Sequence, residues 1–135
     1  MDYLCNFYGS DKAEYWQEGK GHGYTKYYTE ELEYKKDKAI NILEIGSFSG
    51  ASAAAFSKYF PMSKIFCLDI NITNFRYKSK SIDVYGLDIN NINEILKFFK
   101  KIGLSNHQQY FDIIIDDGSH KLDDMLFSFN FFFKY

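Results

Sequence analysis

The stretch "INILEIGSFSGASAAAFSKYF", residues 40–60, decides the fold. It starts with apolar residues typical of a strand, passes through a loop with two glycines, and continues as an alanine-rich segment that ends at Pro61. A short apolar run followed by a turn and a helix is typical of parallel α/β sheets. Because a proline disfavours the helical conformation in the residue before it, we expect a strand over 40–45 and a helix over 51–60.

The same alternation continues along the rest of the chain. Apolar residues recur at helical spacing over 92–102, and the uninterrupted isoleucines 113–115 suit a central strand covered on both faces. The further expected strands are 64–69, 82–85 and 111–115, and the further expected helices are 92–102 and 122–133.

The first part of the chain differs in its residue pattern. Residues 1–38 mix aromatic residues, glycines and charges, and they predict a loop-rich lead-in with a short helix near 27–34. We therefore expect two parts, an N-terminal lid segment over 1–38 and a cofactor-binding core over 39–135.

The core is predicted to be α/β, a Rossmann-like, doubly wound and mostly parallel sheet with strand order 3-2-1-4. Further strands would be needed to cover the outer side of strand four, and none follows here. An apolar edge strand is an aggregation liability. We interpret the chain as a fragment that lacks its C-terminal strands, or as one whose sheet another chain completes, as in a homo-oligomer.

Composition argues against several classes of protein. The formal net charge is −2 and Arg76 is the single arginine, so no basic stripe indicates nucleic-acid binding. Cys5 and Cys67 form no CxxC pattern, and the N-terminus does not resemble a signal peptide. No apolar run approaches the ~20 residues that span a bilayer. The sequence predicts a soluble cytoplasmic protein with neither a nucleic acid nor a membrane as its partner.

Acidic residues stand where the expected strands end, which is where ligands bind in open α/β sheets. They are Glu44, Asp69, Asp88, Asp116 and Asp117. A pyrophosphate-binding loop would need a glycine at the position of Phe48, and an anionic ligand would gain nothing from Glu44. The loop therefore favours a ligand that carries a positive charge.

Residues 44–50 have the pattern E-x-G-x-x-x-G, with an acid at the end of the next strand, as in S-adenosylmethionine enzymes. Gly46 and Gly50 let the backbone turn tightly and approach a ligand. Glu44 would face the ammonium group of the cofactor, Asp69 would accept hydrogen bonds from the ribose, and Asp88 would lie near the adenine amino group. The alternative is a plain turn with helix-capping acids, which is a serious alternative for Asp88.

The stretch "FDIIIDDGSH", residues 111–120, brings two carboxylates and a histidine to the end of the last strand. Adjacent carboxylates repel each other unless a cation is near, and oxygen ligands favour a hard ion such as Mg²⁺. Histidine can take a proton near neutral pH. Together these groups indicate a hydroxyl methyltransferase; alternatively, Asp116 and Asp117 cap the last helix and His120 is an ordinary surface histidine.

Five motifs together resemble a known family, the class I S-adenosylmethionine-dependent methyltransferases of the macrolide-sugar type, the mycinamicin and macrocin O-methyltransferases and their bacterial relatives. The motifs are "YGSDK" (8–12), "GHGYTKYY" (21–28), "ILEIGSFSGAS" (42–52), "FCLDI" (66–70) and "FDIIIDDGSH" (111–120). The resemblance covers nearly the whole chain, and "DDGSH" after an apolar strand is its most specific part.

The resemblance implies that Mg²⁺ is held by acids at the fourth strand and by further acids after a fifth strand, which is absent here. By position, Asp117 is the metal ligand, Asp116 lies beside the cofactor or the metal, and His120 is the general base on a sugar hydroxyl. The expected cofactor-binding residues are Glu44, Gly46, Ser47, Gly50, Asp69, Asp88 and Asp116, and the lid candidates are Asp11, Lys12, His22 and Tyr24. For the lid candidates, ordinary surface-loop chemistry is the alternative.

The leading hypothesis is a metal-assisted O-methyltransferase that acts on a sugar or a glycosylated small molecule. One alternative is a catalytically incomplete cofactor-binding or assembly module, because the metal site would be incomplete in this chain. Another is a relative of the cephalosporin hydroxylase-like proteins. A nicotinamide-dependent oxidoreductase shares the broad fold, but Phe48 in place of the middle glycine argues against it.

Overall fold

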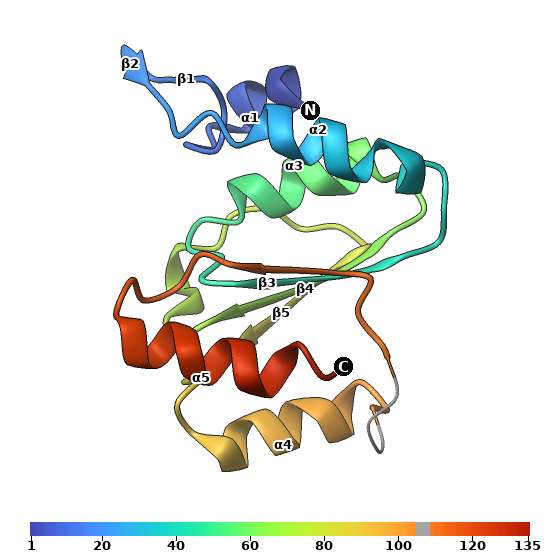
Figure 1. Ribbon diagram of the computed structural model, residues 1–135, viewed down its shortest axis with the longest axis vertical. Coiled ribbons are helices and arrows are strands. Elements are labelled where there is room, and N and C mark those ends of the chain that lie inside the picture. Colours follow the sequence, from blue (N-terminus) through green and yellow to red (C-terminus); the bar gives the residue numbers. More distant parts are fainter. Residues whose placement is uncertain (105–108) are drawn as a thin grey trace.

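The computed structural model describes residues 1–104 and 109–135 and has an α/β fold, which confirms the predicted class (Figure 1). Its main sheet is parallel, with the strand order β5-β4-β3-β6. This is the predicted order 3-2-1-4, since β3 is the first strand of the core. The elements of the core are β3 (Asn41–Ile45), α3 (Ala51–Tyr59), β4 (Lys64–Asp69), η2 (Ile72–Asn74), β5 (Ile82–Gly86), α4 (Ile92–Lys101), β6 (Ile113–Asp116) and α5 (Leu122–Phe132).

Strand β3 lies in the centre of this sheet and is buried along almost its whole length. Ile45 stands opposite Leu68 of β4 on one side and opposite Asp116 of β6 on the other. Because all four strands run in the same direction, their carboxyl ends meet at one edge of the sheet. The register therefore brings the acidic strand ends together, as the sequence predicts.

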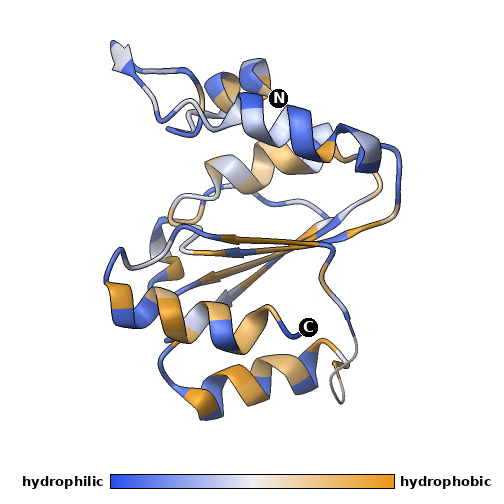
Figure 2. Ribbon diagram, viewed as in Figure 1, coloured by the Kyte–Doolittle hydropathy of each residue, from blue (hydrophilic) through white to orange (hydrophobic). Residues whose placement is uncertain are grey.

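The two faces of the sheet are covered by different helices (Figure 1). Leu43 and Ile45 belong to the apolar cluster that packs against α4 and α5. Ile42 belongs to the cluster around Phe56 of α3 on the opposite face. Since side chains alternate along a strand, Glu44 points toward the α3 face. Figure 2 shows largely apolar strands between helices that carry both polar and apolar residues.

The N-terminal segment contains more regular structure than predicted. It consists of α1 (Asp2–Tyr8), the hairpin strands β1 (Tyr15–Trp16) and β2 (Gly19–Lys20), α2 (Thr25–Leu32) and η1 (Glu33–Lys35). The expected short helix is present as α2, but α1 and the hairpin were missed. Helix α1 packs Cys5 against Ala55 of α3, a contact that local sequence does not reveal. The division into 1–38 and 39–135 stays a prediction.

One side of β6 pairs with β3, and within the described residues no strand pairs with its other side. The neighbouring helix α5 exposes an apolar stripe. Its members are Leu122, Met125, Leu126, Phe129 and, just past the helix, Phe133. In the same described part, no helix has the length and apolar character needed to cross a membrane.

Gly46 is where the loop after β3 touches the loop after β6. Its φ is +79°, and a Cβ atom at this position would lie 2.6 Å from the carbonyl carbon of Asp117 and would clash with the adjoining oxygen. At Gly50, the space for a Cβ is filled by the ring of Phe75. The two glycines were predicted to allow the approach of a ligand. In the structure, neighbouring parts of the chain occupy the space beside each Cα.

We predict that Gly46→Ala lowers the free energy of unfolding by at least about 2 kcal/mol, because it adds a backbone clash to the cost of a left-handed conformation. The matched control is Gly9→Ala. Gly9 has a similar φ of +77°, but no described atom lies within 4 Å of its Cβ position. Urea denaturation of both variants measures the difference, and equal losses would show that the contact with Asp117 carries no cost.

Candidate functional site

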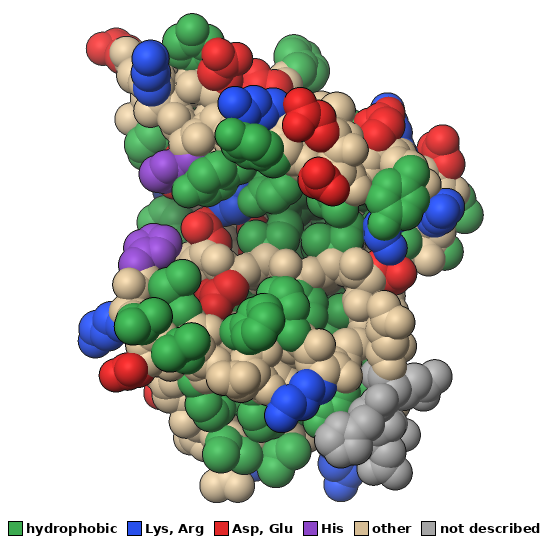
Figure 3. Space-filling view, in the orientation of Figure 1, with side chains coloured by type: hydrophobic (Ala, Val, Ile, Leu, Met, Phe, Trp, Pro, Cys, Tyr) green, Lys and Arg blue, Asp and Glu red, His purple; other side chains and the backbone are tan. Residues whose placement is uncertain are grey.

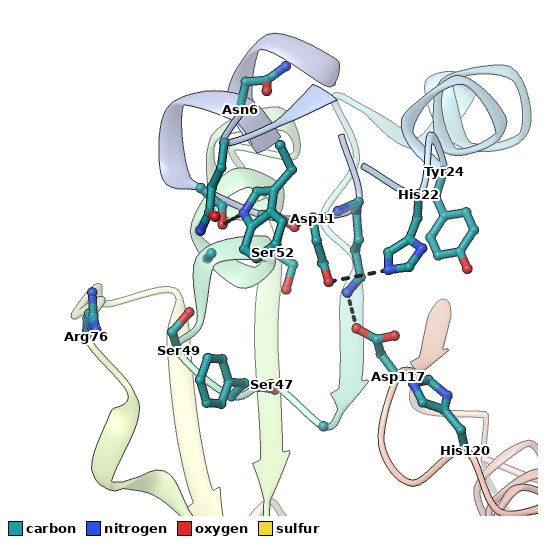
Figure 4. A pocket seen from close by; sticks show the side chains of 18 residues that line it. Asn6, Asp11, His22, Tyr24, Ser47, Ser49, Ser52, Arg76, Asp117 and His120 are labelled. Carbon is teal, nitrogen blue, oxygen red and sulfur yellow. Dashed lines mark hydrogen bonds and ion pairs between the residues drawn. The ribbon is translucent and has the colours of Figure 1, made fainter. Parts of the chain in front are cut away.

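Two adjoining pockets open where the parallel strands end. The N-terminal pocket, a cavity of about 720 Å³, lies between the N-terminal segment and the strand ends (Figure 4). Its lining includes all the lid candidates as well as Asp117 and His120. The strand-end pocket, of about 470 Å³, is lined by Asp69, Asp88 and Asp117 among others. His22 and His120 both line the N-terminal pocket, and Figure 3 shows an indentation on the face where histidine side chains lie.

Lys12 connects the two carboxylates at the centre of the site. It is only 3% exposed, and its Nζ forms an ion pair with Asp117 and lies 3.9 Å from Oε1 of Glu44. Burial lowers the pKa of Lys12, but the negative charge of Glu44 and the hydrogen bond with Asp117 raise it by more. The pKa of Lys12 therefore lies above its ordinary value. Lys12 is therefore a charged ammonium inside the protein.

Glu44 is fully buried at the carboxyl end of β3. Burial raises the pKa of Glu44 above its ordinary value, while the ion pair with Lys12 and the hydrogen bond donated by Ser52 oppose that shift. Its second oxygen, Oε2, has no hydrogen-bond partner among the described residues. A buried carboxylate oxygen without a partner is costly. Glu44 lines neither of the two pockets, so Oε2 is not open to either of them in this structure.

Asp69 organises the loop after β3. Its carboxylate accepts backbone hydrogen bonds from Phe48, at 2.7 Å, and from Asn71, at 2.9 Å. It therefore fixes the distance between the loops that follow β3 and β4. The same side chain lines the strand-end pocket, where its remaining lone pairs can accept hydrogen bonds.

Asp88 also lines the strand-end pocket and does not cap α4. The N-cap of α4 is Asn91, whose side chain accepts a hydrogen bond from the backbone of Asn93. The Asp88 carboxylate accepts one from the backbone N–H of Asn90 at 2.9 Å. The helix-capping alternative for Asp88 is therefore wrong, and its carboxylate stays at the pocket.

Asp116 and Asp117 are adjacent in sequence but have different surroundings. Asp117 lines both pockets, whereas Asp116 lines neither and accepts a hydrogen bond from the backbone of Gly118. Neither of them caps α5, whose N-cap is Lys121. The exposed His120 lines the N-terminal pocket on the same loop as Asp117. The structure thus brings Asp117 and His120 together and leaves Asp116 apart.

The other candidates surround the N-terminal pocket. Ser47 lines it and donates its hydroxyl to the backbone carbonyl of Glu44. His22 lies 3.5 Å from Asp11 and stacks on Tyr24, with ring centroids 5.2 Å apart. Gly46 lines both pockets, whereas Gly50, at the start of α3, lines neither.

Sequence reasoning missed several residues around the N-terminal pocket. Trp16 and Arg76 line it, and Ser52 lines it and also bonds to Glu44. It missed above all that Lys12 is the partner of Glu44 and Asp117. One signal was available. Two acids at neighbouring strand ends need a cation nearby, and the quoted motif "YGSDK" ends with a lysine, Lys12.

The donors present do not form a metal centre by themselves. Among the described residues, no group of three or more histidine, cysteine or acidic side chains could hold a metal ion. Asp117 provides one carboxylate, already paired with Lys12, and Asp116 turns to its own backbone. A magnesium ion at Asp117 would have to displace the Lys12 ammonium and take its other ligands from elsewhere.

No protein-family model matches the chain, but individual proteins do. It is 31% identical, over an alignment 142 residues long, to the L-olivosyl-oleandolide 3-O-methyltransferase of Streptomyces antibioticus, and the match covers all of this chain and 34% of that protein. The chain thus spans about a third of the length of this relative.

Two solved structures extend the comparison. The MycE methyltransferase of the mycinamycin pathway, in complex with Mg, SAH and mycinamycin VI, matches with a TM-score of 0.59 and 28% identity, over 79% of this chain and 27% of that one. A CmcI structure with Mg and SAM matches with a TM-score of 0.59 and 14% identity, over 87% of this chain and 52% of that one. The latter likeness shows the fold alone.

The Rossmann-like fold, with the strand order β5-β4-β3-β6, resembles that of the class I S-adenosylmethionine-dependent methyltransferases. Within that class, the chain resembles MycE and the macrolide-sugar O-methyltransferases. This resemblance was predicted from the five motifs, and it is confirmed.

We predict that Ser52→Ala lowers the free energy of unfolding by about 1–3 kcal/mol at neutral pH, because the buried Glu44 carboxylate loses a donor. Burial holds the pKa of Glu44 above its unfolded value, so this group favours folding at low pH and loses that contribution as pH rises through its folded pKa. The hydrogen bond from Ser52 lowers the pKa of Glu44 because it stabilises the charged carboxylate. Removing this hydroxyl should therefore reduce the free energy of unfolding more at neutral than at acidic pH.

Urea denaturation at several pH values measures this effect. The matched control is Ser57→Ala on the same helix, since the Ser57 hydroxyl donates to the backbone carbonyl of Ala54 and not to Glu44. A loss in Ser52→Ala that does not change with pH, or one matched by Ser57→Ala, would contradict the assignment to Glu44.

Proposed function

We propose that this chain forms the methyl-donor site of an S-adenosylmethionine-dependent O-methyltransferase that acts on a hydroxyl of a sugar or glycosylated small molecule. One observation carries the proposal. The strand-end pocket with Asp69 and Asp88 adjoins the N-terminal pocket with His120, and Asp117 lines both. Such an arrangement can hold a donor and an acceptor next to each other, as methyl transfer needs.

The cofactor is proposed to lie across the two pockets. Its adenosine would occupy the strand-end pocket, with Asp69 accepting from the ribose hydroxyls and Asp88 near the adenine amino group. Its ammonium would meet Oε2 of Glu44, which lacks a partner in the described structure. Gly46, Ser47 and Gly50 shape the loop between these positions, while Asp116 supports the loop from behind by bonding to Gly118.

His120 is the proposed general base. It would accept the proton of the acceptor hydroxyl while the oxygen attacks the methyl carbon in line with the sulfonium. The carbon–oxygen bond forms as the carbon–sulfur bond breaks, and the bonding pair leaves with sulfur to give S-adenosylhomocysteine. Asp11, Lys12, His22 and Tyr24 would form a lid that excludes water from this step.

Magnesium was expected at Asp117 and Asp116, and the MycE and CmcI structures described above contain Mg. In those proteins the ion is part of the bound complex. Here the described donors do not fit a metal by themselves, because Lys12 already neutralises Asp117. No step of the proposed reaction passes through a metal.

A second candidate is a cofactor-binding module without catalysis. It is favoured by the lack of a three-ligand cluster in the described residues and by the exposed apolar stripe on α5. The two candidates share cofactor binding and differ in whether His120 is needed for turnover.

Cofactor binding is tested by titration calorimetry with S-adenosylhomocysteine and with NAD. We expect binding of S-adenosylhomocysteine and no binding of NAD, because the loop carries Phe48 at a pyrophosphate glycine position and acids at the strand ends. Binding of NAD alone would refute the methyltransferase proposal.

Catalysis is tested with His120→Ala in the whole protein. We expect kcat for methylation of a glycoside to fall by about 100-fold or more, as for the loss of a general base. The affinity for S-adenosylhomocysteine should not change, because the cofactor is assigned to other residues. An unchanged kcat would support the non-catalytic module.

A further inference from the structure

Lys12 is the only buried lysine within residues 1–104 and 109–135, and the carboxylates of Glu44 and Asp117 face it. An ammonium group has three N–H donors. The ion pair with Asp117 uses one of them, and Glu44 lies at 3.9 Å, longer than a hydrogen bond. Lys12 also lines the N-terminal pocket, so it can offer a donor to a ligand there.

Glu44 is the negatively charged partner of Lys12 and supplies hydrogen-bond acceptors. Its Oε1 accepts from Ser52 and lies near Lys12, while Oε2 is buried without a partner among the described residues. Glu44 itself lines neither pocket, so an ammonium donor of a ligand would satisfy this oxygen only after the residues that separate it from the N-terminal pocket move. The pair therefore offers an acceptor for a cation and a donor for an anion a few ångströms apart.

An α-amino acid carries its ammonium and its carboxylate on a single carbon, and thus needs receptors for both charges at this kind of separation. The first turn of α3 adds a second feature that favours an anion. Ala51 and Ser52 line the N-terminal pocket at the start of this nine-residue helix, and the first N–H groups of a helix point outward and carry a partial positive charge.

We propose that Lys12 binds the carboxylate of the amino-acid end of the cofactor, while Glu44 binds its ammonium. The inference rests on the proposed function and adds to it a residue that recognises the anionic half of the ligand. It moves Lys12 from the lid to the binding site. The N-terminal segment then belongs to the cofactor site, because Lys12 reaches the site from the loop between α1 and β1.

Arg76 is the other cation that lines this pocket within the described residues, but it is less suitable. Its side chain is exposed, and it lies on the loop after β4, beyond Ser49 and away from Asp117 (Figure 4). No ion pair joins it to Glu44 in the described structure. The ion pair with Glu44, the proposed ammonium receptor, thus favours Lys12.

The test compares three ligands by calorimetry: S-adenosylhomocysteine, its decarboxylated analogue, which keeps the ammonium, and 5′-methylthioadenosine, which lacks the amino-acid end. We expect the unaltered protein to bind S-adenosylhomocysteine about 10–100-fold more tightly than the decarboxylated analogue, the range for hydrogen bonds to charged groups. Equal affinities would overturn the inference, although the proposed function would stand. Failure of all three ligands to bind would overturn both.

Lys12→Met should abolish the preference for the carboxylate and leave the affinity for 5′-methylthioadenosine unchanged. Lys12→Arg should keep much of the preference, and Lys78→Met, at an exposed lysine outside both pockets, should keep all of it. Equal weakening of all three ligands by Lys12→Met would show a structural role and overturn the inference.

If Lys12→Met does not fold, Arg76→Met still tests which cation binds the carboxylate. We expect it to retain the preference for S-adenosylhomocysteine over the decarboxylated analogue. If Arg76→Met removes that preference, Arg76 is the carboxylate receptor and the inference is wrong.

Discussion

The site depends on one buried ammonium group between two carboxylates. Without Lys12, the fully buried Glu44 would have no oppositely charged partner among the described residues and would be repelled by Asp117, an acid of like charge. Removing one partner of a buried ion pair is strongly destabilising, because it leaves an uncompensated charge. Lys12 thus joins the N-terminal segment, the end of β3 and the loop after β6.

Much of the fold could be predicted because the core repeats one local pattern. Residues 40–60 already contain a strand, a glycine turn and a helix, and the isoleucines of β6 indicate a strand covered on both faces. Helix α1 could not be predicted in this way. It is stabilised by the contact of Cys5 with Ala55, 50 residues further along the chain, and short helices gain most of their stability from such packing.

The acids of the site were predictable for a topological reason, since parallel strands place their carboxyl ends along one edge. Their separate roles were not. Asp116 ends β6 and bonds to its own turn, whereas Asp117 lines both pockets, and this difference follows from the direction of each side chain after the last strand residue. The pairing of Lys12 with Asp117 joins residues 105 positions apart, a distance over which sequence patterns carry no information about partners.

The contact between Gly46 and Asp117 has a thermodynamic consequence. The backbone N–H of Asp117 donates to the carbonyl of Ile45, and the Asp117–Gly118 backbone fills the space beside the Gly46 Cα. A shift of the loop that carries His120 must therefore move the glycine loop as well. In the proposed enzyme, an acceptor that displaces one loop would change the affinity for the methyl donor at the other. By linkage, the donor would change the affinity for the acceptor by the same factor.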